Sequence, residues 1–243
     1  MSAVTTTSVT SLAIAFEAWT VALIAALAWI GRIRLPASQA WRLPALPLGW
    51  TLWAFLLTAA GVLESATRPP GIVILVVPIL LTCLVTFGTG SLGRGMAANI
   101  PLWWLVALQS FRLGVEAVLQ GLSQAGWIPH AMTLAGGNVE FIYAATALLV
   151  AWLVRRGTLT AWFVQVWNVL GVLSLLNVVV RAVGSAPGPA HFLATEVPNV
   201  ATSRFPFALI PAVMVPLAIA LHLVIARAAS ARKAAAVLQA SAA

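Results

Sequence analysis

The chain contains several apolar runs that are each long enough to cross a lipid bilayer, with short connections between them. A helix needs roughly 20 apolar residues to span the hydrocarbon core of a membrane. Runs bounded by proline, glycine or basic residues occupy residues 9–30, 46–63, 71–88, 99–122, 139–154, 159–183 and 205–226. They predict an all-α integral membrane bundle of seven transmembrane helices.

Composition supports a lipid environment. Hydrophobic residues make up 62% of the chain and charged residues only 7%, whereas a soluble domain carries about 25% charged residues. We therefore expect residues 1–243 to form a single transmembrane domain, without a separate soluble domain. The first basic residue, Arg32, follows the first apolar run, which is the reverse of the order in a secretory signal. We expect this run to be retained as the first helix.

The basic residues predict the orientation, since short cytoplasmic loops collect Lys and Arg. One set of alternate loops holds nine of the thirteen basic residues: Arg32, Arg34, Arg42, Arg94, Arg155, Arg156, Arg227, Arg232 and Lys233. The other set holds Arg68 and Arg204. The bias predicts an N terminus outside, a C terminus in the cytoplasm, and a cytoplasmic tail over residues 228–243 that is either disordered or an extension of the last helix.

Several common functions are not supported. The basic residues that give the net charge of +8 are scattered over loops, so no nucleic-acid partner is expected. The single cysteine, Cys83, excludes a disulfide or a cysteine metal site. The lone lysine lies in the tail, which argues against a retinal protein. The glycines of GTGSLG at 88–93 match the pattern of a dinucleotide-binding loop, but the strand that must precede such a loop is missing. We predict that the protein binds no metal and no cofactor, and we assign no catalytic residue.

Polar side chains form a stripe on the fourth predicted helix. Gln109, Arg112, Glu116 and Gln120 are three or four residues apart and so face the same neighbours. Arg112 falls near the middle of the bilayer, where an isolated Arg costs at least about 2.5–3.5 kcal/mol. Glu116 is the nearest partner, but Arg before the acid is the weaker order for such a pair. A further partner on another helix is expected.

The acidic residues suggest where that partner lies. All five are glutamates, and the predicted topology puts them in the outer half of the membrane or in outer loops. We predict an outward-opening polar cavity between the first, fourth, fifth and sixth helices. Its candidate binding residues are Arg112, Glu116, Glu17, Glu140, Asn138, Asn168, Asn177 and Arg181. The alternative is that Arg112 and Glu116 form a structural pair that only fixes helix packing.

Two segments allow a dynamic or a static interpretation. The loop at 123–138 has no formal charge and is either a lid, re-entrant over the cavity, or an ordinary interfacial loop. In the last helix, Pro206, Pro211 and Pro216 form a hinge or a static bend. His222 is expected to be a packed or interfacial residue near the cytoplasmic end.

The strings FRLGVE at 111–116, IPHAMT, GGNVE, Trp167-Asn168 and FPFALIPAVMVP, the last followed by Leu221-His222, together resemble a group of uncharacterised bacterial multi-pass membrane proteins. The resemblance covers roughly residues 100–227. It implies a bacterial inner (cytoplasmic) membrane and carries no activity.

Two functions from different classes fit these observations. The first is a small-molecule transporter or binding protein in which Arg112 holds a small polar or anionic ligand and Glu116 balances its charge. The second is an accessory or scaffold subunit that packs against a membrane-protein partner. A third possibility is a membrane enzyme acting on lipid, with Glu116 or Glu140 as general base.

Overall fold

The computed structural model describes residues 3–64, 70–188 and 191–241, and every regular element in these ranges is a helix or a helical turn. The α-helices are α1 (Ala3–Arg34), α2 (Ala37–Ala40), α3 (Arg42–Ala59), α4 (Gly71–Cys83), α5 (Ser91–Asn99), α6 (Leu102–Leu108), α7 (Arg112–Gln124), α8 (Glu140–Arg155), α9 (Ala161–Ser185) and α10 (Val215–Ser241). The 3-10 turns are η1 (Val62–Glu64), η3 (Gln109–Phe111), η4 (His130–Met132), η5 (Leu134–Gly136) and η6 (Ala201–Ser203), and the π turns are η2 (Leu84–Thr89) and η7 (Ile210–Met214). The all-α prediction is confirmed.

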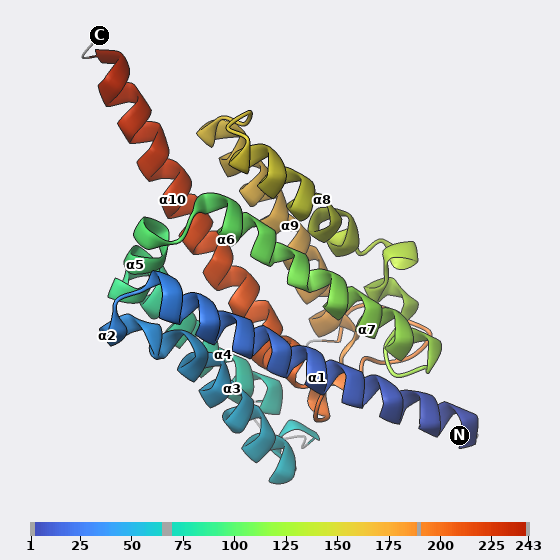
Figure 1. Cartoon of the computed structure of the whole chain (residues 1–243). Helices are drawn as coiled ribbons and strands as arrows, with labels where there is room; N and C mark the ends of the chain where they lie inside the picture. Colours follow the sequence, from blue (N-terminus) through green and yellow to red (C-terminus); the bar gives the residue numbers. More distant parts are fainter. Residues whose placement is uncertain (1–2, 65–69, 189–190, 242–243) are drawn as a thin grey trace.

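The long helices run side by side along one direction, and the chain passes back and forth between two ends of the bundle (Figure 1). α10 packs against α4, α5, α6 and α9, and its apolar residues from Leu217 to Ile225 are largely buried. In contrast, large apolar side chains of α1, α3, α8 and α9 point away from the bundle. Because such a surface is unfavourable in water, it fits a protein surrounded by lipid.

Five helices in the described ranges are long and apolar enough to cross a membrane: Ser8–Arg34, Gly71–Thr89, Leu102–Gln124, Ala161–Ser185 and Ile210–Ala234. They correspond to five of the seven predicted runs. The other two runs form α3, which begins with a charged residue and contains Pro47, and α8. With 16 residues, α8 is about 24 Å long at 1.5 Å per residue.

The ends of the predicted runs differ from the observed helix ends at several prolines. The fourth run begins at Leu102 rather than at residue 99, because Pro101 precedes the first turn. The last helix begins at Ile210, so Pro206 lies before it and Pro211 lies in its first turn. That helix continues to Ser241, which makes most of the predicted tail helical. Arg68, which lies between the second and third predicted runs, falls outside the described residues.

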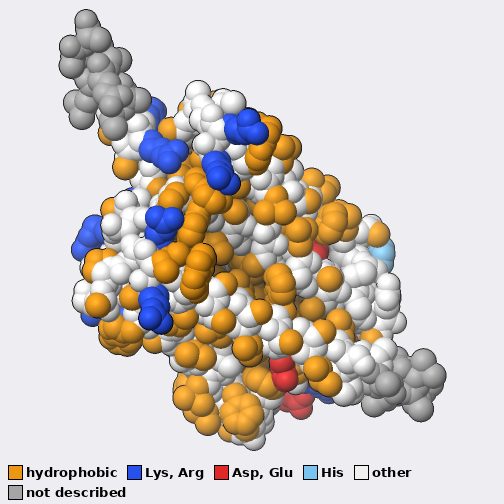
Figure 2. Space-filling view, viewed as in Figure 1, with side chains coloured by type: hydrophobic (Ala, Val, Ile, Leu, Met, Phe, Trp, Pro, Cys, Tyr) orange, Lys and Arg blue, Asp and Glu red, His pale blue; other side chains and the backbone are white. Residues whose placement is uncertain are grey.

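Basic side chains gather at one end of the bundle, which we call the basic end. It combines the last turn of α1, the start of α3, α5, the last turn of α8 and the outer part of α10. Figure 2 shows most of the blue Lys and Arg side chains at this end and the red acidic side chains toward the other. The end that includes the α7–α8 loop is called the opposite end.

Candidate functional site

Arg112 lies where η3 becomes α7, and only 3% of its surface is exposed. Of the polar stripe on this helix, Gln109 and Glu116 are also buried, whereas Gln120 is exposed. The guanidinium of Arg112 forms an ion pair with both carboxylate oxygens of Glu140 on α8. Glu140 is the first residue of α8, so its side chain enters the bundle from the helix start. The partner expected on another helix is therefore Glu140.

Further groups surround the same guanidinium. Its Nη1 lies 3.1 Å from Nε2 of His222 and 3.4 Å from Oε1 of Gln109, while Nη2 lies 3.5 Å from the carbonyl oxygen of Gly171. The Tyr143 ring adds a cation–π contact, with its centroid 4.7 Å from the guanidinium carbon. Both terminal nitrogens of Arg112 are thus bonded within the chain.

His222 is held in one tautomer by Asn168 on α9. The Nδ1 of His222 lies 2.8 Å from Oδ1 of Asn168, and Nδ2 of Asn168 donates to the backbone carbonyl of His222 at 3.1 Å. Because Oδ1 only accepts, Nδ1 carries the hydrogen, and Nε2 is left to accept from Arg112. His222 is therefore neutral in this arrangement and adds no charge to the site.

Asn138 connects the side chain of Glu116 to the backbone of Glu140. Its Oδ1 accepts the backbone N–H of Glu140 at 3.0 Å, and its Nδ2 donates to both oxygens of Glu116 at 3.0 and 3.1 Å. The same Nδ2 also donates to the carbonyl of Met132 at 2.9 Å. Glu140 receives a further bond, at 3.0 Å, from Oγ of Ser174. Glu140 is well satisfied, whereas the two oxygens of Glu116 share one hydrogen of Asn138.

These contacts define the Arg112 cluster, whose members are Arg112, Glu116, Asn138, Glu140, Asn168, Ser174 and His222. It contains one guanidinium and two carboxylates, all buried. Within residues 3–64, 70–188 and 191–241, Glu116 has no ion pair. If both glutamates were ionised, the cluster would carry one negative charge in excess.

Three of the predicted site residues lie elsewhere. Glu17 is exposed on α1, because Phe16 and Thr20 occupy the inward-facing positions of that helix. Arg181 bonds instead to Asn177, with Nε 3.1 Å from Oδ1, and its Nη1 donates to two backbone carbonyls of the α7–α8 loop. These two residues anchor that loop and make no contact with Arg112.

The loop at 123–138 is packed against the bundle through two 3-10 turns. Ile128 and Met132 are buried, and Gly137 has a φ of 95°, which allows the sharp approach to α8. The carboxylate of Glu196 accepts the backbone N–H of His130, and this bond lowers the pKa of Glu196 from its ordinary value. The loop thus has a defined position, held by Arg181 and Glu196.

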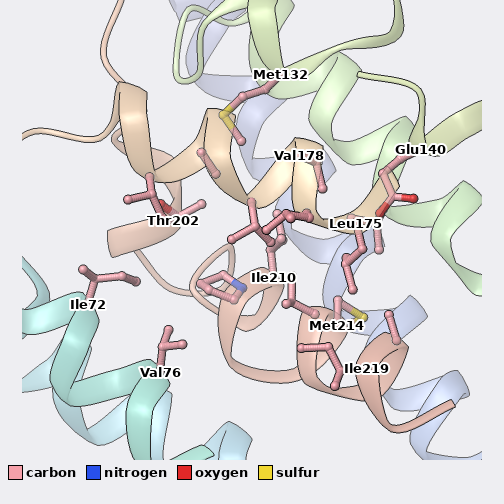
Figure 3. Close-up of a pocket in the computed structure, with 18 of the residues that line it drawn as sticks. Ile72, Val76, Met132, Glu140, Leu175, Val178, Thr202, Ile210, Met214 and Ile219 are labelled. Carbon is pink, nitrogen blue, oxygen red and sulfur yellow. The ribbon is translucent and has the colours of Figure 1, made fainter. Parts of the chain in front are cut away.

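A cavity of about 480 Å³ lies between α4, α7, α9 and α10. Figure 3 shows α4 and α9 on two sides of it, with Ile210, Met214 and Ile219 pointing in from η7 and α10. Its lining extends from Pro70 and Pro187, near the opposite end, to Leu80 and Ile219. Arg112, Glu116 and Glu140 also line this cavity. The buried charges therefore border a space large enough for a small molecule.

Sequence reasoning did not assign Tyr143, Ser174 or His222 to the site. The signal for Ser174 was present, because Asn168, Gly171, Ser174 and Leu175 share one buried face of α9. His222 was expected to be a packed or interfacial residue near the cytoplasmic end of its helix. It is packed inside the bundle, but its contact with Arg112 was not predicted. Among the described residues, no three metal-ligating side chains are close enough to hold an ion.

Comparison with known families gives one result. Residues 69–229 match the model described as Domain of unknown function (DUF8737), and the match includes every residue of the Arg112 cluster. No curated protein and no solved structure matches the chain. Helices α1 and α3 precede the matched region, whereas α4 to α9 and most of α10 lie inside it. The chain belongs to the DUF8737 family.

Proposed function

We propose that the protein is a transporter or binding protein for a small molecule that binds at the Arg112 cluster, in the cytoplasmic membrane of a bacterium. In this proposal seven helices cross the bilayer, the N terminus is outside and the C terminus is in the cytoplasm. The basic end then faces the cytoplasm, as the charge bias of membrane proteins favours. The cavity lining extends toward the outer side, where Pro70 and Pro187 lie.

The observation that supports binding is the second carboxylate, Glu116. An ion pair that only fixed packing would need Arg112 and Glu140, and those two charges balance. Glu116 adds a second carboxyl group, which borders the cavity and, among the described residues, has only the amide of Asn138 as a donor. Ionisable groups inside membranes are expensive and are usually functional. This unbalanced group is therefore the best candidate to bind a ligand.

The ligand chemistry differs from the first expectation. A small polar or anionic ligand was expected on Arg112, but both terminal nitrogens of Arg112 are bonded to groups of the chain. Of the charged groups that line the cavity, the carboxylate of Glu116 has the fewest bonds within the described residues, and it accepts hydrogen bonds when ionised. A ligand that donates hydrogen bonds fits this site better than one that accepts them.

The test is thermal unfolding of the purified protein in a maltoside detergent, with acetate, inorganic phosphate, choline and octylamine as probes. At least one probe should raise the Tm of the wild type and of Glu17→Gln, in which an exposed glutamate of α1 is changed. The same probe should leave the Tm of Glu116→Gln unchanged. The binding proposal fails if no probe stabilises the wild type, or if Glu116→Gln responds equally.

A second function is favoured by the internal bonding of Arg112. Since this guanidinium is bonded on several sides, it also suits a rigid scaffold that packs against a partner through its apolar outer faces. An accessory subunit should copurify with another membrane protein at a fixed ratio under mild solubilisation. A fixed-ratio complex without any response to the four probes would favour this function over ligand binding.

A further inference from the structure

We infer that the cavity binds a lipophilic amine whose apolar chain enters sideways from the bilayer between α4 and α9 and whose ammonium group pairs with Glu116. This inference rests on the proposed function and names the ligand class of the same site. Figure 3 shows the space between these helices that the apolar chain of the ligand would occupy.

The lining determines the apolar part of the ligand. Apart from Arg112, Glu116, Glu140 and Thr202, every lining residue is apolar. A hydrophilic solute would leave its polar groups unpaired against this wall, which is unfavourable by several kcal/mol in an apolar environment. An alkyl chain instead exchanges lipid contacts for similar protein contacts. The lining therefore favours a ligand that is already dissolved in the membrane.

The rim provides the route. On α4, Val73 and Val77 line the cavity and are 40% and 46% exposed, and on α9 Leu176 lines it and is 55% exposed. Val77 and Leu176 lie well inside two apolar helices that are long enough to cross a bilayer, and Val73 lies in the first turn of its helix. Both sides of the opening thus present apolar surface to lipid chains. A chain can pass between them without contact with water.

The charges determine the head group. Arg112 lies on the same helix as Glu116. Among the described residues, the ionisable groups that contact Arg112 are Glu140 and Tyr143 on α8 and His222 on α10. Arg112 is paired with Glu140, and His222 is neutral. An ionised Glu116 would leave the site with one negative charge, and a cation of the ligand would balance it. An ammonium adds up to three N–H donors for the free lone pairs of the carboxylate.

The same charge balance predicts proton exchange. Without a ligand, an unpaired buried carboxylate is best accommodated in its neutral form, so Glu116 is expected to hold a proton. Binding of R–NH3⁺ converts Glu116–COOH into Glu116–COO⁻ paired with the ammonium, and the proton leaves to the solvent. One proton is released for each amine bound, and no net charge enters the site. This stoichiometry distinguishes pairing with Glu116 from simple partition into the cavity.

The experiment compares octylamine, 1-octanol and octanoate, which share one chain length and differ in the head group. The protein is reconstituted in phosphatidylcholine nanodiscs, with empty nanodiscs as a blank for partition into lipid. Binding is measured by tryptophan fluorescence and proton release by a pH indicator in weak buffer. Octylamine should bind at least about tenfold more tightly than octanol, octanoate should bind least, and one proton should be released per octylamine.

Two variants and one control test the geometry. Glu116→Gln should lower octylamine affinity to that of octanol and abolish proton release. Val76→Phe, which fills the cavity from α4 without a change of charge, should weaken octylamine and octanol together. Glu17→Gln should behave as wild type. Each variant must unfold cooperatively, so that a loss of binding is not a loss of the fold.

Two outcomes overturn the inference. If octanol or octanoate binds as tightly as octylamine, or if no proton is released, the amine assignment is wrong. Small-molecule binding at the cluster still stands in that case, provided that acetate, phosphate or choline stabilises the wild type but not Glu116→Gln. If neither the octyl compounds nor the hydrophilic probes bind, the inference and the proposed function fail together.

Discussion

The ion pair of Arg112 with Glu140 and the ion pair of Arg204 with Glu64 differ mainly in burial. The side chains of the first pair are 4% and 3% exposed, and those of the second are 47% and 56% exposed. Removing one partner of a buried pair leaves an unpaired charge and costs about 3–5 kcal/mol, whereas a surface pair contributes about 0–1 kcal/mol. The two pairs therefore provide a matched comparison within one chain.

Glu140→Gln is expected to lower the free energy of unfolding by about 3–5 kcal/mol, because Arg112 then loses the carboxylate with which it forms its buried ion pair. Glu64→Gln should change it by less than about 1 kcal/mol. Unfolding in mixed detergent micelles, followed by tryptophan fluorescence, measures both values. Equal effects of the two substitutions would show that the Arg112–Glu140 pair is not buried as described.

Gly171 gives Tyr143 room beside Arg112. A Cβ at residue 171 would lie 2.1 Å from the ring carbon Cζ of Tyr143. This ring stacks on Trp167, with centroids 4.5 Å apart, and cannot move freely. We expect Gly171→Ala to destabilise the protein by about 1–3 kcal/mol through overpacking. Thermal unfolding should show a lower Tm.

Gly49 on α3 provides the control for this substitution. Nothing lies within 4 Å of a Cβ added there, and Gly49 is exposed. Gly49→Ala should leave the Tm unchanged or raise it slightly, since Ala is favoured over Gly in a helix by up to about 1 kcal/mol. If Gly171→Ala is as neutral as Gly49→Ala, the close packing of Tyr143 against α9 is wrong.

At the scale of single residues, helical spacing predicts which residues share one face of a helix but not which faces of different helices meet. Arg112 and Glu116 are four residues apart, and both border the cavity as a stripe requires. Glu17 shows the limit, because its height in the membrane was compatible with the site but its face of α1 points outward. Tyr143 and His222 come from helices whose rotation and end points follow from packing, which one sequence does not reveal.

The α7–α8 loop depends on a bond between an exposed carboxylate and a backbone amide. Glu196 accepts the N–H of His130, and its pKa is lowered below the ordinary value of 4.5 because the bond favours the ionised form. A lowered pKa contributes stability that is present above 4.5 and is lost as the pH falls through the folded-state pKa. The loop should therefore be anchored at neutral pH and loosen only under acidic conditions.

Hydrogen exchange at the His130 amide measures this bond. At pH 7, Glu196→Gln should exchange faster than the wild type at His130, because the neutral amide oxygen is a weaker acceptor than the carboxylate. Below the folded-state pKa of Glu196, the two proteins should exchange at equal rates. The Asn138 amide, which donates to the carbonyl of Thr133, serves as the reference within the loop. A difference that persists in acid would assign the effect to another contact.

The apolar runs of the sequence predict well which helices exist and in which order, but they predict the ends of these helices less well. The run at 71–88 nearly coincides with α4 and η2, since Pro70 precedes it and Gly90 follows it. The run at 205–226 misplaces both ends of the last helix. Its start is misplaced because Pro206 and Pro211 are as apolar as their neighbours yet determine where helical hydrogen bonding begins. Ala-rich residues after 228 continue α10 because Ala favours the helix even without an apolar face.

Over the whole molecule, the charge difference between the two ends is the main argument for orientation. The basic end contains the last turns of α1 and α8 and the first residue of α3, so each of these helices carries basic residues where it reaches this end of the bundle. The orientation depends on α8 crossing the bilayer, and α8 is the shortest of the proposed spans. Its 16 residues cover about 24 Å against a hydrocarbon thickness of about 30 Å.

Single cysteines on either side of α8 test the crossing. Gln124 ends α7 at the opposite end, Thr158 follows α8 at the basic end, and both are exposed, whereas the native Cys83 is buried. A membrane-impermeant maleimide should label Gln124→Cys in intact bacterial cells and Thr158→Cys only after lysis, because the bilayer separates the two sites. The unsubstituted chain should remain unlabelled in both conditions. The reverse pattern would invert the orientation, and labelling of both variants in intact cells would show that α8 does not cross.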